Sequence, residues 1–168
     1  KRRFVTFHDA PGLRPTPDAV RETLFNWLGQ DLTGLACLDL FAGSGVLGFE
    51  AASRGAAHVT LVERDSRTFA VLQDNAAALG ANRLELIRAD ALKFLPRASR
   101  RYDLLFLDPP YNRGWIERVE PRLPGVLAPD ARIYAEAEHP IERIGAWEIA
   151  RSGRAGQVYY HLLEAKTA

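Results

Sequence analysis

The sequence predicts an α/β fold: a seven-stranded, mostly parallel sheet with helices on both faces and an antiparallel hairpin at its C-terminal end. Short apolar runs of strand length alternate with amphipathic helical stretches from residue 35 onward, as in a parallel sheet. The helical pattern fades after residue 130 and leaves three further strand-like runs. A chain of 168 residues, 47% hydrophobic and 26% charged, has the size and composition of one globular domain.

The first predicted element is a helix that begins at Thr16, with this threonine as the N-cap and Pro17 in the first helical position. The apolar residues that follow share one helical face: Val20, Leu24, Trp27 and Leu28. We expect residues 1–34 to form an N-terminal extension and helix, and residues 35–168 the core of the same single domain. Lys1 opens the chain and no methionine follows, so we expect the native N-terminus to be missing.

Four strands are predicted next, at residues 35–41, 58–63, 84–89 and 102–107. A helix is predicted over residues 66–79, with apolar residues along one side: Phe69, Leu72, Ala76 and Leu79. Three more strands are predicted at residues 132–137, 146–150 and 157–163, the last two joined as a hairpin across residues 152–156. Parallel units closed by a terminal hairpin indicate an open sheet with an antiparallel edge.

Composition excludes several classes of function. The single cysteine, Cys37, rules out an intramolecular disulfide and suits a reducing, cytoplasmic setting. No apolar run approaches the ~20 residues of a membrane span, so we expect no membrane partner. A net charge of +1 argues against a generally basic nucleic-acid binder, although residues 83–122 carry more basic than acidic side chains. The four histidines lack ligand spacing, so no metal site is expected: His8, His58, His139 and His161.

Each of the four parallel strands ends at or near an acidic residue: Asp39, Glu63, Asp90 and Asp108. One such acid is often only a turn former or a helix cap. In open α/β sheets, however, ligands bind beyond the carboxyl ends of the strands, where the winding reverses. Four carboxylates in one crevice are costly without donors, so the predicted ligand carries ammonium, hydroxyl and amino groups.

A glycine-rich loop follows the first of these strands. Gly43, Gly45 and Gly48 match G-x-G-x-x-G, and Glu63 comes twenty residues after Gly43, so a nicotinamide dehydrogenase has to be considered. Asp39 argues against it, because a carboxylate there would repel a pyrophosphate. S-adenosylmethionine, with an ammonium and a sulfonium, suits these residues better. Glu63 would accept hydrogen bonds from both ribose hydroxyls, and the acid after the third strand would lie near the adenine amino group.

The fourth strand runs into Asp108-Pro109-Pro110-Tyr111. The prolines make a stiff loop, so the Asp108 side chain and the Pro109 carbonyl are preorganised acceptors for the two N–H groups of a nucleobase amino group. The Tyr111 ring can stack on a base swung out of its helix or loop. The motif therefore predicts methyl transfer to an exocyclic amino group, in which positioning carries most of the catalysis.

With these motifs, the chain resembles the class I S-adenosylmethionine-dependent methyltransferases, which have a Rossmann-like fold. It is most similar to the RsmD-type bacterial enzymes that methylate guanine N2 in 16S ribosomal RNA. The resemblance covers residues 11–163 and rests on four stretches: GLRPTPDAVRETLFNWL (12–28), LDLFAGSGVLGFEAASRGA (38–56), DLLFLDPPY (103–111) and AGQVYYHL (155–162). The Asp-Pro-Pro-Tyr motif alone also fits DNA adenine methyltransferases.

The resemblance implies roles for individual residues. The cofactor-binding set would be Thr16, Arg21, Asp39, Ala42, Gly43, Ser44, Gly45, Glu63, Arg64, Asp90 and Ala91. The catalytic set would be Asp108, Pro109 and Tyr111. Substrate contacts would come from Arg14, Pro110 and Arg113, the two arginines at phosphates.

The implied partner is 16S rRNA within the small ribosomal subunit or an assembly intermediate, and the implied enzyme is a cytoplasmic monomer. Family members usually begin with a basic strand, of which only Lys1-Arg2-Arg3-Phe4 is present here, so RNA affinity is expected to be reduced. The alternatives are a DNA adenine-N6 or other amino-group methyltransferase, a nicotinamide oxidoreductase, and a cofactor-binding module without catalysis.

Overall fold

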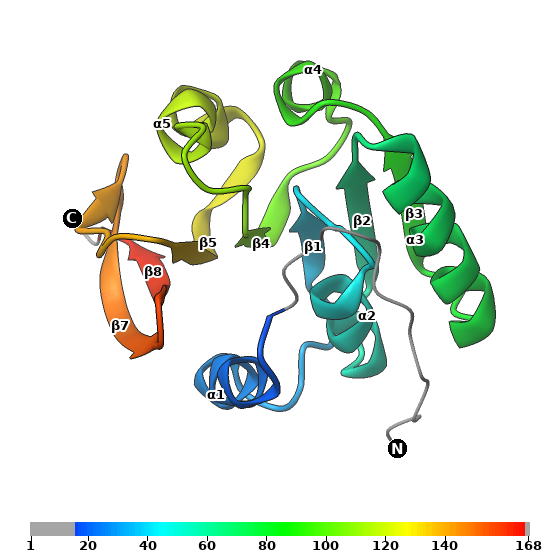
Figure 1. Ribbon diagram of the computed structural model, residues 1–168, viewed down its shortest axis with the longest axis horizontal. Coiled ribbons are helices and arrows are strands. Elements are labelled where there is room, and N and C mark those ends of the chain that lie inside the picture. Colours follow the sequence, from blue (N-terminus) through cyan, green and yellow to red (C-terminus); the bar gives the residue numbers. More distant parts are fainter. Residues whose placement is uncertain (1–15, 167–168) are drawn as a thin grey trace.

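The computed structural model describes residues 16–166 and contains one eight-stranded sheet between two layers of helices (Figure 1). The helices are α1 (Asp18–Leu28), α2 (Val46–Ser53), α3 (Ser66–Leu79), α4 (Ala91–Phe94) and α5 (Trp115–Val119), with 3₁₀ turns η1 (Leu95–Arg97) and η2 (Glu120–Gly125). The strands are β1 (Ala36–Asp39), β2 (His58–Glu63), β3 (Leu84–Arg88), β4 (Tyr102–Leu107), β5 (Leu127–Ala137), β6 (Arg143–Ile144), β7 (Trp147–Ala155) and β8 (Val158–Ala165).

The strand order is β3-β2-β1-β4-β5-β8-β7-β6, with β3 to β5 parallel and the last three strands antiparallel. This confirms the predicted Rossmann-like class, with an open parallel sheet and an antiparallel C-terminal edge. The additional strand is β6, which has only two residues. β5 begins five residues before the predicted start, and the β7–β8 turn is tighter than predicted, since Ala155 already pairs with Val158.

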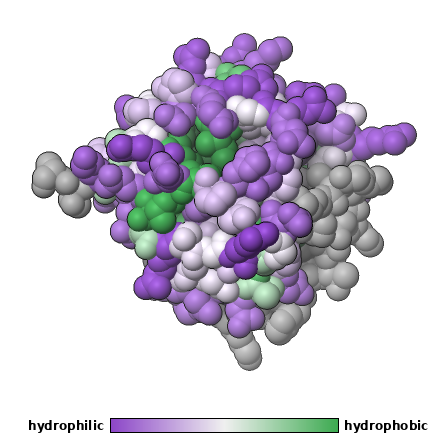
Figure 2. Space-filling model, turned by 60° about the vertical axis from the view of Figure 1, so that its left-hand side comes forward, coloured by the Kyte–Doolittle hydropathy of each residue, from purple (hydrophilic) through white to green (hydrophobic). Residues whose placement is uncertain are grey.

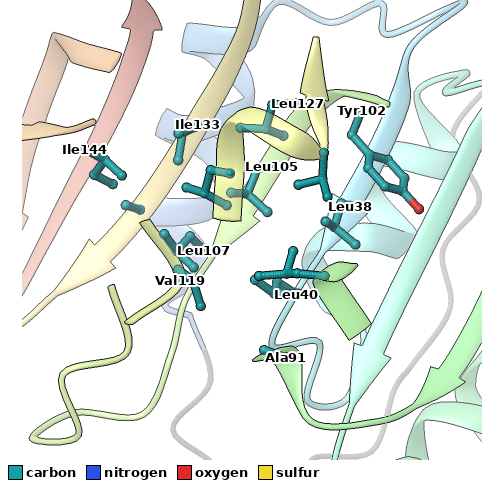
Figure 3. Packing of buried hydrophobic residues seen from close by; sticks show 14 of the residues in the cluster. Leu38, Leu40, Ala91, Tyr102, Leu105, Leu107, Val119, Leu127, Ile133 and Ile144 are labelled. Atoms are coloured by element: carbon teal, nitrogen blue, oxygen red, sulfur yellow. The ribbon is translucent and has the colours of Figure 1, made fainter. Parts of the chain in front are cut away.

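Alternating side chains on the strands divide the core into two clusters, one on each face of the sheet. On β4, Leu104 and Phe106 join the cluster under α1, α2 and α3, whereas Leu105 and Leu107 join the cluster under α4 and α5. Figure 3 shows part of the second cluster, in which Leu105 and Leu107 lie among residues of β1, β5 and α5. Because both faces are covered, the middle strands read as apolar runs without a polar side.

The start of α1 differs from the prediction. Pro17, not Thr16, is the N-cap residue, and no side chain caps this helix. The buried face carries Val20, Leu24 and Leu28, while Trp27 is half-buried and stacks on Tyr160 of β8 with ring centroids 5.4 Å apart. Thr16 does not cap the helix, and its hydroxyl points instead toward Asp108 and Glu136 at the ends of β4 and β5.

Figure 2 shows the face that includes the C-terminal strands, where hydrophilic residues surround a small hydrophobic area. Among residues 16–166, no helix is both long and apolar enough to cross a membrane.

Candidate active site

A cavity of about 770 Å³ lies at the carboxyl ends of the parallel strands. The chain runs from β1 outward to β3 and then returns to place β4 on the other side of β1, so the crevice between β1 and β4 is where the winding reverses. All four predicted acids line this one cavity: Asp39, Glu63, Asp90 and Asp108. Its volume is within the range of small-molecule sites.

The glycine loop between β1 and α2 forms one wall and is held in a fixed shape. Gly45 has φ +97°, and a Cβ there would lie 2.3 Å from the Phe49 ring, so the position requires glycine. Behind the loop, the buried Asn75 amide on α3 donates to the Ser44 carbonyl at 3.0 Å. The loop therefore offers a preformed backbone surface to a ligand.

Asp39, the last residue of β1, is the most buried of the four acids. It is 2% exposed, and its Oδ2 accepts a hydrogen bond from the Gly48 N–H at 3.2 Å. Burial raises the pKa of Asp39 to about 7, and the nearby Glu63 charge adds to the rise, while the Gly48 hydrogen bond opposes it. Such a carboxylate favours a cationic ligand, because a positive charge would offset the cost of burying the negative one.

Glu63 ends β2 and is held by two backbone donors. The Gly43 N–H donates to its Oε1 at 3.0 Å, and the Asp65 N–H donates to its Oε2 at 2.9 Å. Each carboxylate oxygen has a second lone pair, so both can still accept a hydrogen bond from a ligand hydroxyl. The two backbone contacts fix the orientation of Glu63 and tie it to the glycine loop.

Asp90 follows β3 and is the N-cap of α4, where its Oδ2 accepts from the Leu92 N–H at 2.9 Å. Its Oδ1 lies 3.7 Å from a guanidinium nitrogen of Arg64, an arginine whose side chain is 70% exposed. Such an exposed ion pair contributes little to stability. Asp90 therefore both caps α4 and lines the cavity, as predicted.

The Asp-Pro-Pro-Tyr motif directly follows β4 and lines the same cavity. Pro109 is buried and Pro110 is exposed, while Asp108 and Tyr111 are half-buried. The next residue, Asn112, has φ +63°, and its N–H donates to Glu138 Oε1 at 2.9 Å. The loop is thus stiffened by its prolines and anchored to the segment after β5.

The cavity brings together most of the residues predicted for the site: Thr16, Asp39, Ala42, Gly43, Ser44, Glu63, Arg64, Asp90, Ala91, Asp108, Pro109, Pro110, Tyr111 and Arg113. Two predicted residues do not line it. Arg21 donates to Asp18 at 2.9 Å on the exposed side of α1, and Gly45 packs behind the loop against Phe49 and Leu72. Arg14 lies outside the described residues.

Sequence reasoning missed several residues at the site. Phe41, Trp115 and Arg118 line the cavity; the Phe41 and Trp115 rings are 5.2 Å apart, and the Arg118 guanidinium lies 4.0 Å from the Trp115 ring centroid. Glu136 is fully buried on β5 and contacts Thr16. The sequence signal that could have indicated this contact was Glu136 itself, an acid within the otherwise apolar run of residues 133–137. Within residues 16–166, no group of three or more potential ligands forms a metal site.

The fold and the site together define a protein of the Rossmann-like methyltransferase class. The sheet is mostly parallel, its acidic strand ends surround one cavity, and a glycine loop and the Asp-Pro-Pro-Tyr loop line that cavity. Residues 1–164 match the family described as conserved hypothetical protein 95, and the chain belongs to this family.

Similar proteins include the ribosomal RNA small subunit methyltransferase D of Escherichia coli strain K12, 44% identical over 96% of this chain and 84% of that protein. The Haemophilus influenzae protein of the same name is 39% identical over 93% of this chain and 85% of that protein. The solved structure of yhhF from Escherichia coli aligns with a TM-score of 0.84 and 42% identity, covering 95% of this chain and 91% of that one.

Proposed function

We propose that this protein transfers a methyl group from S-adenosylmethionine to the exocyclic N2 amino group of a guanine in 16S ribosomal RNA. The observation that carries the proposal is that the Asp108–Tyr111 loop lines the same cavity as Asp39, Glu63 and Asp90. A nucleobase and a nucleoside cofactor would therefore meet inside one enclosure. The family relationship supports an RNA substrate, since the relatives named above are ribosomal RNA methyltransferases.

The donor and acceptor groups of the cavity suit this cofactor. Asp39 would pair with its ammonium, Glu63 would accept from its ribose hydroxyls, and Asp90 would accept from its adenine amino group. The backbone at Gly43 and Ser44 would lie against it, since both residues line the cavity. The cofactor supplies an activated methyl group.

The residues at the target end position the amino group. Asp108 and the Pro109 carbonyl each accept one N–H, which turns the nitrogen lone pair toward the cofactor end of the cavity. Tyr111 stacks on the base, worth about 1–3 kcal/mol per base. The N–H groups become more acidic as the nitrogen is methylated, so a strong base is not needed, and Asp108 holds the departing proton before solvent takes it. The rigid prolines keep these acceptors from relaxing, which is electrostatic preorganisation.

The substrate would be RNA within the small ribosomal subunit or an assembly intermediate, and the enzyme would act as a monomer in the cytoplasm. Arg113 and Arg118 are exposed and line the cavity, where they would contact phosphates next to the target nucleotide. A small domain with net charge +1 gains little general affinity for RNA, so recognition would depend on substrate shape.

The test is methyl transfer from labelled S-adenosylmethionine to under-methylated small subunits, free 16S RNA and duplex DNA, followed by nuclease digestion. The proposal expects N2-methylguanine from the subunits. Label in adenine would instead indicate an adenine-N6 enzyme, like the tRNA1(Val) adenine-N6-methyltransferase from Enterobacter, which is 36% identical over 81% of this chain and 58% of that protein. Absence of label on all three substrates would contradict the proposal.

A further inference from the structure

We propose that Glu136 is a positioning residue that holds the Thr16 hydroxyl against the Asp108 carboxylate and thereby fixes the target-base end of the cavity. This inference rests on the function proposed above and concerns the same site. β4 and β5 are paired in register, with Phe106 opposite Tyr134. Asp108 and Glu136 each come two residues later, so they lie next to each other on the face that α1 covers.

A single hydroxyl, that of Thr16, lies between these two acids. Thr16 Oγ1 lies 2.9 Å from Glu136 Oε2 and 3.4 Å from Asp108 Oδ2. The Tyr134 hydroxyl donates to the same Glu136 oxygen at 2.7 Å. A threonine hydroxyl has one hydrogen, and the shorter contact draws it toward Glu136. The Thr16 oxygen is thereby held in place beside the Asp108 carboxylate.

The burial of Glu136 indicates that this acid does more than fill space in the core. Its side chain is fully buried, and an apolar residue of similar volume would pack there at lower cost. Burial and the Glu136 charge raise the pKa of Tyr134 far above its usual value, so the phenol stays protonated and remains a donor. Glu136 thus accepts hydrogen bonds from the Thr16 and Tyr134 hydroxyls, among its contacts, where Thr16 meets the ends of β4 and β5.

Thr16 should therefore affect methyl transfer and not cofactor binding. The family resemblance implied a contact between Thr16 and the cofactor, but the Thr16 hydroxyl lies between Glu136 and Asp108, with the shorter contact to Glu136. Loss of the hydroxyl should therefore slow methyl transfer without weakening cofactor binding. Thr23 on α1 provides a matched control, because its hydroxyl is exposed and donates only within the helix, to the Ala19 carbonyl at 2.9 Å.

The experiment compares Thr16→Val, Thr16→Ser and Thr23→Val in single-turnover methyl transfer and in S-adenosylhomocysteine titrations. We expect Thr16→Val to slow transfer at least tenfold with the cofactor Kd within twofold, Thr16→Ser to restore most of the rate, and Thr23→Val to match the wild type. A wild-type rate in Thr16→Val, or no rescue by serine, would overturn the proposal. A rise in the cofactor Kd that parallels the rate loss would also overturn it and assign Thr16 to the cofactor.

The role of Glu136 is tested in a double-mutant cycle with Glu136→Met. If Glu136 acts through Thr16, Thr16→Val should have no further effect in that background, whereas additive losses would refute the link. The same cycle is read from urea unfolding midpoints, which do not depend on activity. Failure of the wild type to methylate RNA would contradict the proposed function, and the unfolding cycle would still decide whether Thr16 and Glu136 are coupled.

Discussion

Replacing Asp39 with asparagine should stabilise the protein while weakening cofactor binding. Asp39 is 2% exposed, and its pKa is raised by burial from 3.8 to about 7. Because the folded-state pKa exceeds the unfolded one, the unfolded state ionises first, and stability is lost as the pH rises from about 4 through about 7. Asparagine keeps an oxygen that can accept from the Gly48 N–H but does not ionise.

The expected magnitude follows from this shift. One pKa unit corresponds to about 1.4 kcal/mol, so ionisation of Asp39 costs on the order of 4 kcal/mol above pH 7. The stability difference between Asp39→Asn and wild type should therefore widen by about 2–3 kcal/mol between pH 5 and pH 8. An exposed carboxyl on α3 provides the control, and Asp74→Asn should show no such widening.

The assay is urea unfolding of the ligand-free protein at both pH values, with S-adenosylhomocysteine affinity measured in parallel. We expect Asp39→Asn to unfold at higher urea at pH 8 and to bind the ligand at least tenfold more weakly. A stability difference that does not change with pH would refute the assigned ionisation. Unchanged ligand affinity would refute the pairing of Asp39 with the ligand ammonium.

Three other perturbations test separate parts of the structure. Glu63→Ala should raise the cofactor Kd at least tenfold before it affects transfer at saturating cofactor, and an unchanged Kd would contradict the ribose role. Gly48→Ala should cost about 1–3 kcal/mol of unfolding free energy, because its Cβ would lie 2.6 Å from Leu61 Cδ2. Gly125→Ala is the control for it, since a Cβ there meets nothing within 4 Å, and equal effects of the two changes would contradict the packing argument. His161 is buried and accepts a hydrogen bond from the Ile141 N–H at 3.0 Å, and burial lowers its pKa. Because the unfolded state binds the proton first, the stabilising contribution of His161 should be complete above pH 6.5 and lost as the pH falls below it. Urea midpoints of wild type and His161→Gln should converge from about pH 7.5 to about pH 5.5, and a constant difference would show that the ring does not titrate in this way.

The parallel part of the fold could be predicted because its middle strands, β1, β2 and β4, are largely buried on both faces and read as short apolar runs. The bounds of β2, β4 and α3 agree with the prediction residue for residue. The start of β5 was missed because Pro129 and Asp130 interrupt its apolar pattern, and the register shifts between Tyr102 and Leu104 on the neighbouring strand. β6 was missed because its two residues are too few to show the alternation of apolar and polar residues that predicts a strand.

The cavity acids could be predicted because parallel strands bring their carboxyl ends to one edge, which places Asp39, Glu63 and Asp108 together. Contacts that depend on tertiary packing could not be predicted. Thr16-Pro17-Asp18 has the sequence of a helix cap, yet the Thr16 hydroxyl binds Glu136, 120 residues later in the chain. Arg21 had a local partner in Asp18, and such a helical ion pair competes with any distant ligand.

The most direct test of the central claim, that one cavity holds both cofactor and target base, is the single-turnover rate of Asp108→Ala on under-methylated small subunits at saturating cofactor. We expect transfer to fall at least a hundredfold while the S-adenosylhomocysteine Kd stays within about threefold of wild type, because charge-assisted hydrogen bonds to the substrate amino group are worth roughly 1.5–3 kcal/mol and positioning is lost with them. Loss of cofactor affinity in step with the rate, or a rate near that of the wild type, would contradict it.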